Sequence, residues 1–207
     1  MKKYELTAEF IEKWGKKLFR IKALISFGSV EAGELGGYIE KEDNLAHDGN
    51  AWVSGNAEVY GDARVSGDAR VSGNAEVYGD ARVSGDAEVY GDARVSGNAR
   101  VSGDARVYGD ARVCGDARVC DDADYLLIGR IGSRFSFTTF FKNKDKGITV
   151  SCGCFLGTIA EFRAKVTDTH GNNKHAKMYN LAADMAELQI LGEEHFDKLN
   201  TNKSELF

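Results

Sequence analysis

Small and hydrophobic residues recur every six positions through residues 51–122, and this period dominates the chain. Each of twelve consecutive hexads reads Ala-x-Val-x-Gly-Asn/Asp, from Ala51 to Asp122, except that Asp121 replaces the glycine of the last one. A fixed short period indicates a solenoid, and a six-residue period indicates a parallel β-helix. The pattern predicts that the valines point inward, that the alanines lie near corners, and that Gly-Asn or Gly-Asp makes the turns.

Two apolar-rich runs precede the hexads, at residues 9–14 and 17–27, and Gly15-Lys16 separates them. This arrangement predicts a β-hairpin. A stack of parallel coils exposes unpaired backbone at its ends, which invites end-to-end association. Residues 1–50 are therefore expected to cap the solenoid.

The six-residue period extends weakly beyond the regular hexads at both ends. Ile39 and Leu45 are six residues apart, which indicates that the period already begins there. Two surplus residues follow, and a loop around His47-Asp48-Gly49 is expected to absorb them. Tyr125 and Ile131 are also in phase, which predicts the start of a fifth coil.

The region after the hexads has a pattern of its own. Residues 134–141 and 147–155 are expected to form strands joined by a charged turn. Thr158-Ile-Ala-Glu161 is a capping box that opens a helix, and Gly171-Asn-Asn173 is expected to end it. A second helix is expected from about Lys174 to Leu191, where apolar residues recur at helical spacing at Met178, Leu181, Met185 and Leu188.

Composition narrows the function classes. The chain has 207 residues, no proline and a formal net charge of −5 at pH 7. The acidic balance argues against non-specific binding to nucleic acid, and no apolar run is long enough to span a membrane. The first residues do not read as a signal peptide, so a cytoplasmic location is expected. The four cysteines are expected to be thiols or metal ligands.

The hexads resemble the left-handed β-helix of the bacterial hexapeptide-repeat family at all twelve units. In that fold three hexads make one triangular coil, so the resemblance implies four coils and a spacing of 18 residues between neighbours on adjacent coils. Acyltransferases of this fold use a histidine as general base near a subunit boundary, and the carbonic-anhydrase branch holds zinc with three histidines. The hexads contain no histidine, and only His47 lies beside them, as a weak candidate base.

The expected fold is therefore mainly β, a left-handed parallel β-helix with an N-terminal β-hairpin cap and a small C-terminal α+β module. The expected divisions are residues 1–50 for the hairpin and cap, residues 51–124 for a β-helix of about four coils, and residues 125–207 for the C-terminal module.

The 18-residue spacing predicts ladders of outward side chains. Arginines Arg64, Arg82, Arg100 and Arg118 stack on one face, where like-charged neighbours should repel. This ladder could bind phosphate or an acidic protein, or the corner aspartates could neutralise it in a surface network. Two tyrosine ladders could be interface patches or could simply stabilise a sheet face; they are Tyr60 with Tyr78 and Tyr90 with Tyr108.

The C-terminal region holds four candidates for chemistry, Cys152, Cys154, His170 and His175. Two thiols and two imidazoles could form a tetrahedral zinc site, although C-x-C followed by H-x4-H differs from the usual finger spacing. In an alternating strand both cysteines would point to one face, but they could equally be small buried hydrophobes. A nucleophilic Cys154–His170 pair is a further alternative. Basic residues that could contact an acidic partner, or form only a solvated turn, are Arg134, Lys142, Lys144 and Lys146.

Two further resemblances concern longer segments. Residues 17–122, with the run Gly33-Glu-Leu-Gly-Gly-Tyr-Ile-Glu40 ahead of the hexads, resemble a bacterial and prophage-encoded family of hexapeptide transferases, whose label rests on the fold. The run Val150-Ser-Cys-Gly-Cys-Phe155 and its flanks resemble a small domain common in proteins of phages and mobile elements. Together they imply a phage or prophage accessory protein that acts in the host cytoplasm.

The sequence predicts a non-catalytic solenoid scaffold that binds a partner macromolecule, most simply a protein, because the hexads are nearly identical and lack a catalytic base. In a mobile element that partner could be a host defence factor, which would make the chain an inhibitor. The alternative is a hexapeptide acyltransferase that works as a trimer with acetyl-CoA and His47. No cofactor is expected under the first hypothesis, apart from the zinc considered above, and a dimer or trimer is expected under both.

Overall fold

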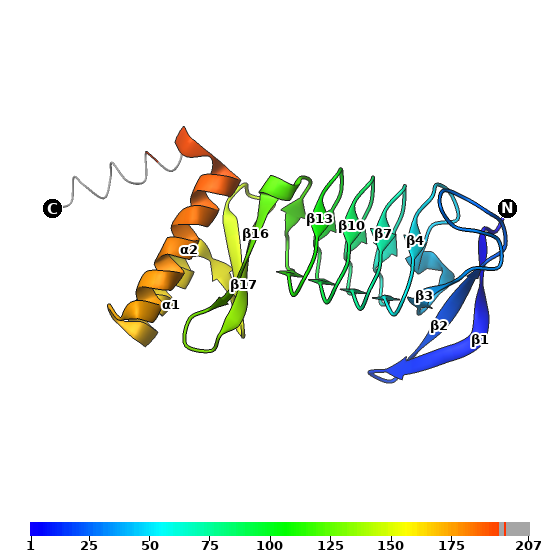
Figure 1. Ribbon diagram of the computed structural model, residues 1–207, viewed down its shortest axis with the longest axis horizontal. Helices are drawn as coiled ribbons and strands as arrows, with labels where there is room; N and C mark the ends of the chain where they lie inside the picture. Colours follow the sequence, from blue (N-terminus) through cyan, green and yellow to red (C-terminus); the bar gives the residue numbers. More distant parts are fainter. Residues whose placement is uncertain (195–196, 198–207) are drawn as a thin grey trace. The chain divides into compact units, whose positions relative to one another are not determined.

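The computed structural model describes residues 1–194 and 197 and contains two compact units (Figure 1). The solenoid unit consists of Met1–Asp116 and Cys120–Asp122. The C-terminal unit consists of Ala117–Val119 and the chain from Ala123 onward. None of the described helices is both long enough and apolar enough to cross a membrane.

Each hexad contributes one two-residue strand that ends in its buried valine. Every hexad alanine and valine has no exposed surface, and burial of one valine contributes about 1.5–3 kcal/mol relative to exposure. The strands are β4 (Trp52–Val53), β5 (Glu58–Val59), β6 (Arg64–Val65), β7 (Arg70–Val71), β8 (Glu76–Val77), β9 (Arg82–Val83), β10 (Glu88–Val89), β11 (Arg94–Val95), β12 (Arg100–Val101), β13 (Arg106–Val107), β14 (Arg112–Val113) and β15 (Arg118–Val119).

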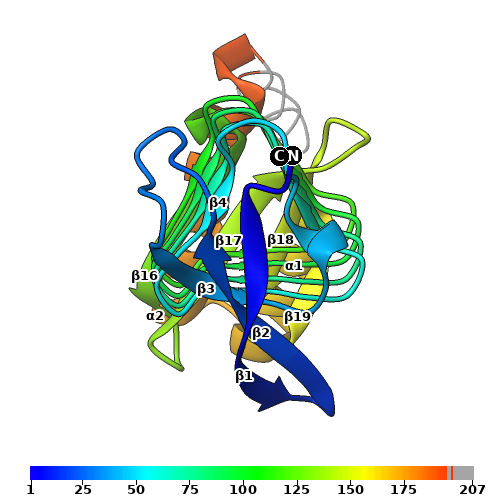
Figure 2. The ribbon, with the colours of Figure 1, turned by 90° about the vertical axis from the view of Figure 1, so that its right-hand side faces the viewer.

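Strands one coil apart pair in parallel, so the solenoid unit has three faces. One face contains β5, β8, β11 and β14, a second contains β4, β7, β10 and β13, and the third contains β6, β9 and β12. The register joins residues 18 apart, as in Arg64 with Arg82 and Glu58 with Glu76. The coils follow one another closely when the solenoid is viewed along its axis (Figure 2). The predicted parallel β-solenoid and its stacking period are confirmed.

An additional turn precedes the regular hexads. Strand β3 (Leu35–Ile39) pairs in parallel with β5, and Ile39 lies opposite Val59, 20 residues further on. Leu45 forms a parallel bridge to Val65 at the same offset, whereas Trp52 pairs with Arg70 at an offset of 18. The two surplus residues thus lie between Leu45 and Trp52, where the sequence placed them. The solenoid therefore has about five turns.

The predicted N-terminal hairpin is confirmed with different limits. Its strands are β1 (Tyr4–Lys13) and β2 (Lys16–Ala23), and the turn between them places Trp14 and Gly15 at φ values of 53° and 75°. Strand β2 pairs antiparallel with β3, so the hairpin extends one solenoid face into a seven-stranded sheet. The backbone edge of the first turn on that face is therefore paired.

Two buried polar side chains fasten the hairpin to the first turn. The Lys3 ammonium donates to the carbonyl oxygens of Gly49 and Ala51 at 3.2 and 2.9 Å. The Tyr4 hydroxyl shares its single proton between the carbonyl oxygens of Glu42 and Leu45, which lie 2.9 and 2.8 Å away. Burial lowers the pKa of Lys3, and nearby carboxylates offset part of that effect. These contacts explain why β1 begins at Tyr4, well before the predicted start. A short 3-10 helix, Glu42–Asn44, supplies one of the carbonyl acceptors.

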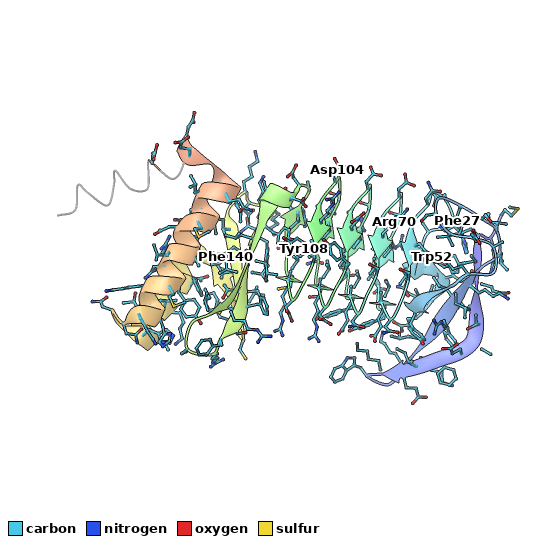
Figure 3. The ribbon with its side chains drawn as sticks, viewed as in Figure 1. Phe27, Trp52, Arg70, Asp104, Tyr108 and Phe140 are labelled. Atoms are coloured by element: carbon cyan, nitrogen blue, oxygen red, sulfur yellow. The ribbon has the colours of Figure 1, made fainter. Side chains whose placement is uncertain are left out.

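The C-terminal unit is a four-stranded antiparallel sheet covered by two helices. A short 3-10 helix, Asp122–Asp124, leads into it. The sheet order is β16-β17-β18-β19. Its core contains Phe140 (labelled in Figure 3), Val150, Phe162 and Ala183. The elements are β16 (Tyr125–Ile131), β17 (Ser136–Lys142), β18 (Ile148–Cys152), β19 (Phe155–Thr158), α1 (Ile159–His170) and α2 (Lys174–Leu191).

Two expectations for this region are wrong. Tyr125 and Ile131 do not start a fifth coil, because both belong to β16, which pairs antiparallel with β17. Residues 147–155 do not form one strand, because Gly153 at φ 60° makes a turn and Cys152 pairs with Phe155 across it. The capping box is confirmed: Glu161 N–H donates to Thr158 Oγ1 at 3.2 Å, and the Glu161 carboxylate accepts from Thr158 N–H at 2.8 Å.

Helix α2 buries a different face from the one its large apolar residues suggest. The buried positions are mainly alanines, including Ala176, Ala183 and Ala186. The periodic residues Met178, Leu181, Met185 and Leu188 are 40–63% exposed. Small side chains let a helix backbone lie close to a sheet, so the packing of α2 follows its alanines.

The stack of glycine turns gives a direct test of the solenoid. Gly85 has a φ of 69°, and a Cβ added there would lie 2.9 Å from the Gly103 nitrogen of the next coil. Gly115 has nearly the same φ, 66°, with open space around it. Gly115→Ala should cost about 1–2 kcal/mol for the backbone conformation alone, and Gly85→Ala should cost more. Urea unfolding followed by circular dichroism measures the difference, and equal losses would contradict the stacked-turn geometry.

Candidate functional site

Three exposed arginines form a continuous ladder on the third solenoid face. Arg64 lies opposite Arg82, and Arg82 lies opposite Arg100, in one parallel register. Among the described residues, none of the three has a carboxylate within ion-pair distance. The other arginine rows differ, because Arg94 pairs with Glu76 at 3.2 Å and Arg106 with Glu88 at 3.9 Å.

The corner aspartates beside Arg64, at the N-terminal end of this ladder, bond to residues other than the arginines. Asp62 accepts from Lys41 at 2.7 Å, and this bond lowers the Asp62 pKa. Asp68 accepts from the backbone and side chain of Asn50 at 3.0 and 2.8 Å. The fourth predicted member, Arg118, belongs to the C-terminal unit and donates to the Ala117 carbonyl at 2.8 Å. The name arginine ladder is used below for Arg64, Arg82 and Arg100.

A groove of about 550 Å³ lies beside the N-terminal end of the arginine ladder, at Arg64 and Arg82. Arg64, Arg82 and the serines beside them line one side. Glu42, Asp43 and His47 line the opposite end. The groove therefore combines a basic wall with an acidic end, and only its basic wall continues down the solenoid.

His47 is held as a structural residue. Its ring stacks on Tyr4 at a centroid distance of 4.4 Å, and its Nδ1 accepts the Lys3 backbone N–H at 3.3 Å. Because Nδ1 uses its lone pair in this bond, the neutral ring carries its proton on Nε2. Nε2 is buried and lies 3.7 Å from a Glu42 oxygen. This tautomer offers no free lone pair to a substrate proton.

The first tyrosine ladder is tied to the hairpin. Tyr60 and Tyr78 stack at 5.1 Å with an interplanar angle of 4°. The Lys13 ammonium lies over the Tyr60 ring and pairs with both Glu58 and Glu76. Burial raises the pKa of the Tyr60 hydroxyl, and the charge of Glu76 adds to this effect. These contacts are typical of aromatic stacking that stabilises a sheet face.

The second tyrosine ladder is more open. Tyr90 and Tyr108 stack at 5.6 Å, and Tyr108 is 48% exposed. Tyr90 also lines a groove of about 420 Å³ with Trp52 and Arg70. Figure 3 labels Arg70 and Tyr108 on this face and places Trp52 at its N-terminal end, where the Phe27 and Trp52 rings meet edge to face at 5.4 Å.

A cavity of about 400 Å³ lies wholly within the C-terminal unit. Helices α1 and α2 contribute His170 and Tyr179, whose rings stack at 5.8 Å. Burial raises the pKa of Tyr179, the adjacent Cys152 thiol raises it further, and Arg134 opposes both. Thr138 Oγ1 donates to Cys152 Sγ at 3.2 Å. This cavity is called the C-terminal cavity below.

The C-terminal cavity gathers three of the four predicted zinc candidates. Cys152, Cys154 and His170 line it. His175 lies behind, with its ring 5.8 Å from that of His170. The Gly153 turn separates the two cysteines, so they do not share one strand face. Across residues 1–194 and 197, no three His, Cys, Asp or Glu side chains are grouped so that they could hold a metal ion.

The predicted basic group divides among several environments. Lys142 pairs with Asp124 at 2.7 Å, whereas Arg134 lines the C-terminal cavity. Lys144 and Lys146 lie in the turn after β17, which Asn143 organises by accepting the N–H groups of Asp145 and Gly147. No local pattern indicates that Lys13 or Tyr179 joins these sites, because both are brought in by contacts distant along the chain.

Comparison with known families identifies the repeat. A family model described as YdcK Beta solenoid repeat matches residues 57–73, 63–79, 69–85, 87–103, 93–109 and 99–115. No curated protein matches the chain. The chain thus contains a β-solenoid repeat similar to that of YdcK, which agrees with its three stacked faces.

Lys13 should stabilise the junction between hairpin and solenoid. Burial alone would lower the Lys13 pKa, but Glu58 and Glu76 outweigh burial and raise it above its ordinary value. Lys13→Ala should lower the free energy of unfolding at neutral pH by about 1–3 kcal/mol, because two stacked carboxylates lose their shared cation. Lys13 is charged below its unfolded pKa of about 10.4, and its contribution should vanish as pH rises through the higher folded pKa.

Urea unfolding between pH 7 and pH 11 measures this effect of Lys13. Lys22→Ala, on the exposed side of β2, is the matched control. A Lys13→Ala loss no larger than that of the control at pH 7 would contradict the bridging role.

His47→Ala tests the structural role of the histidine. The substitution removes the stack on Tyr4 and leaves the Lys3 N–H without its acceptor, so it should lower the free energy of unfolding by about 1–3 kcal/mol. His47→Gln retains a hydrogen-bond acceptor and should lose less. Thermal unfolding of both variants provides the measurement, and an unchanged midpoint for His47→Ala would contradict the assignment.

Proposed function

We propose that the chain is a non-catalytic β-solenoid that binds an acidic partner macromolecule, most simply a protein, along the arginine ladder. The observation that carries the proposal is that none of Arg64, Arg82 and Arg100, three arginines in one row, has an ion-paired carboxylate among the described residues, whereas Arg94 and Arg106 on the other faces have one each. Like charges one strand spacing apart, about 4.8 Å, repel each other. A bound row of carboxylates would relieve that repulsion.

The charge of the whole chain favours a protein over a nucleic acid as the partner. The chain is acidic overall, at −5, and the exposed corner residues beside the ladder include Asp86 and Asp104. A polyphosphate backbone would meet these carboxylates on both sides of a narrow basic strip. An acidic strand or helix that presents carboxylates in a single row would contact the arginines and avoid the corners.

The resemblance to prophage-encoded sequences suggests a host defence factor as the acidic partner. A rigid solenoid that occupies an acidic surface of a host defence factor would block that surface without catalysing a reaction. The acyltransferase alternative receives no support from His47, whose Nδ1 lone pair is already used.

Two variants with the same change in net charge test the ladder. One carries Arg64→Gln, Arg82→Gln and Arg100→Gln, and the other carries Arg70→Gln, Arg94→Gln and Arg106→Gln on the other two faces. Loss of three surface ion pairs worth about 0.5–1 kcal/mol each should weaken binding of poly-L-glutamate by about 10-fold or more for the first variant. The second variant should stay within about threefold of the wild type.

Capture from a bacterial host lysate extends the test to a natural partner. A protein that is retained by the wild type and the second variant, but not by the first, supports the proposal. Equal loss in both variants would show that only net charge matters and would overturn the ladder assignment.

A further inference from the structure

The C-terminal cavity has the size of a small-molecule site. Its volume of about 400 Å³ falls within the usual range of ligand pockets, about 300–1,000 Å³. All of its lining residues belong to β-strands, turns and helices of one compact unit. The described lining therefore comes from the C-terminal unit alone.

The charged residues of the lining are all basic. Arg134 and Lys165 carry fixed positive charges and His170 adds an imidazole, and the lining found among the described residues contains no aspartate or glutamate. Lys165 forms an ion pair with Asp168 at 3.0 Å, but both side chains are more than 60% exposed, and such surface pairs exchange easily. Arg134 has no carboxylate within ion-pair distance among the described residues.

The remaining wall is aromatic and apolar. Phe162 lies at its centre, with its ring 5.6 Å from Phe155 and 5.6 Å from Tyr179. Tyr179 in turn stacks with His170. Val166 completes this wall, and hydroxyl groups of Ser133, Ser136 and Thr169 lie among the lining residues. Phe162, Val166 and Tyr179 are at most 6% exposed, so a flat ring would pack mainly on the half-buried rings of Phe155 and His170 while its polar groups reach the basic residues.

We propose that the C-terminal cavity binds a free phosphate monoester that carries an aromatic or heteroaromatic ring, of about the size of a nucleoside monophosphate. Two fixed cations match the charge of a phosphate dianion, and Arg134 offers the forked donor geometry that suits phosphate oxygens. The serine and threonine hydroxyls supply additional neutral donors. The aromatic wall supplies the stacking surface for the ring.

Isothermal titration calorimetry on the whole chain tests the proposal with probes that separate charge from ring. Phenyl phosphate and adenosine 5′-monophosphate contain both parts. Inorganic phosphate contains only the charge, and adenosine contains only the ring. At least one of the two complete probes should bind at least about tenfold more tightly than either part alone, since each part contributes its own contacts.

Single substitutions locate the binding. Arg134→Gln and Lys165→Gln should each weaken binding of the complete probe by about tenfold or more, because each removes a charge-assisted hydrogen bond. Lys177→Gln removes a cation from an exposed position of α2 outside the cavity, so its affinity should match that of the wild type. Circular dichroism checks that the variants are folded.

The exposed thiol of Cys154 gives a second readout that does not depend on heat of binding. Cys154 and the less exposed Cys152 both line the cavity. The substitutions Cys114→Ser and Cys120→Ser remove the two thiols that lie outside it. Bound phenyl phosphate or adenosine 5′-monophosphate should slow the reaction of Cys154 with a thiol reagent severalfold, and Arg134→Gln should remove that protection.

Three results would overturn the inference. The first is absence of binding by both complete probes at 10 mM, a concentration far above that of ordinary metabolite sites. The second is equal affinity for inorganic phosphate and for the complete probes, which would exclude the aromatic wall. The third is equal loss in Lys177→Gln and Arg134→Gln, which would place binding outside the cavity.

Discussion

The structure depends on a backbone hydrogen-bond ladder in which residues of one coil pair with residues of the next at a fixed offset. In this ladder Arg64 N–H donates to Ala81 C=O, and Arg82 N–H donates to Ala99 C=O, each at 2.9 Å. The offset is fixed because the interior admits only alanine and valine, and the corners require glycine at positive φ with little room for a side chain. A side chain on the exterior consequently has its neighbours assigned by the hexad in which it stands. The arginine ladder and both tyrosine ladders follow from this single constraint.

The same constraint leaves the first coil with an edge, and the N-terminal hairpin covers part of it. At the start of the hairpin, Lys3 and Tyr4 donate to the carbonyl oxygens of Ala51 and Leu45 in the first turn, which has no preceding coil to supply donors. Lys13 extends the cover down one face, across the Glu58–Glu76 pair. The hairpin that pairs with the first turn thus also contacts one tyrosine ladder, Tyr60 with Tyr78, through Lys13. The arginine ladder lies on a different face, which the hairpin does not extend.

The predictable parts of the chain are those where the signal is local or strictly periodic. The Ala-x-Val hexads predicted the core and the 18-residue stacking, and Thr158 with Glu161 predicted the start of α1. Contacts distant along the chain were not predictable, because nothing near Lys13 in the sequence indicates Glu58 and Glu76. The buried face of α2 was missed for another reason: apolar periodicity gives most weight to large residues, whereas close packing selected alanines. The C-terminal cavity was not predictable for the first of these reasons, because Arg134, Lys165 and Tyr179 come from three different elements.

The identical interior of the hexads has an evolutionary consequence, because any hexad can fill any position of the core. Exterior neighbours are three hexads apart, so the number of hexads between two side chains decides whether they stack. Loss of the single hexad 75–80 would leave every buried contact of the same kind, yet it would place Glu88 below Arg64 and Arg82 below Glu58. Arg82 and Arg100 would remain stacked on each other, and Arg94 would come to lie below Arg70, so the pairing of charges across the junction would change without a single amino-acid substitution. Duplication or loss of three hexads would change only the length of each row. Recombination between near-identical hexads can therefore change or conserve the pairing of exterior side chains across a junction in one event.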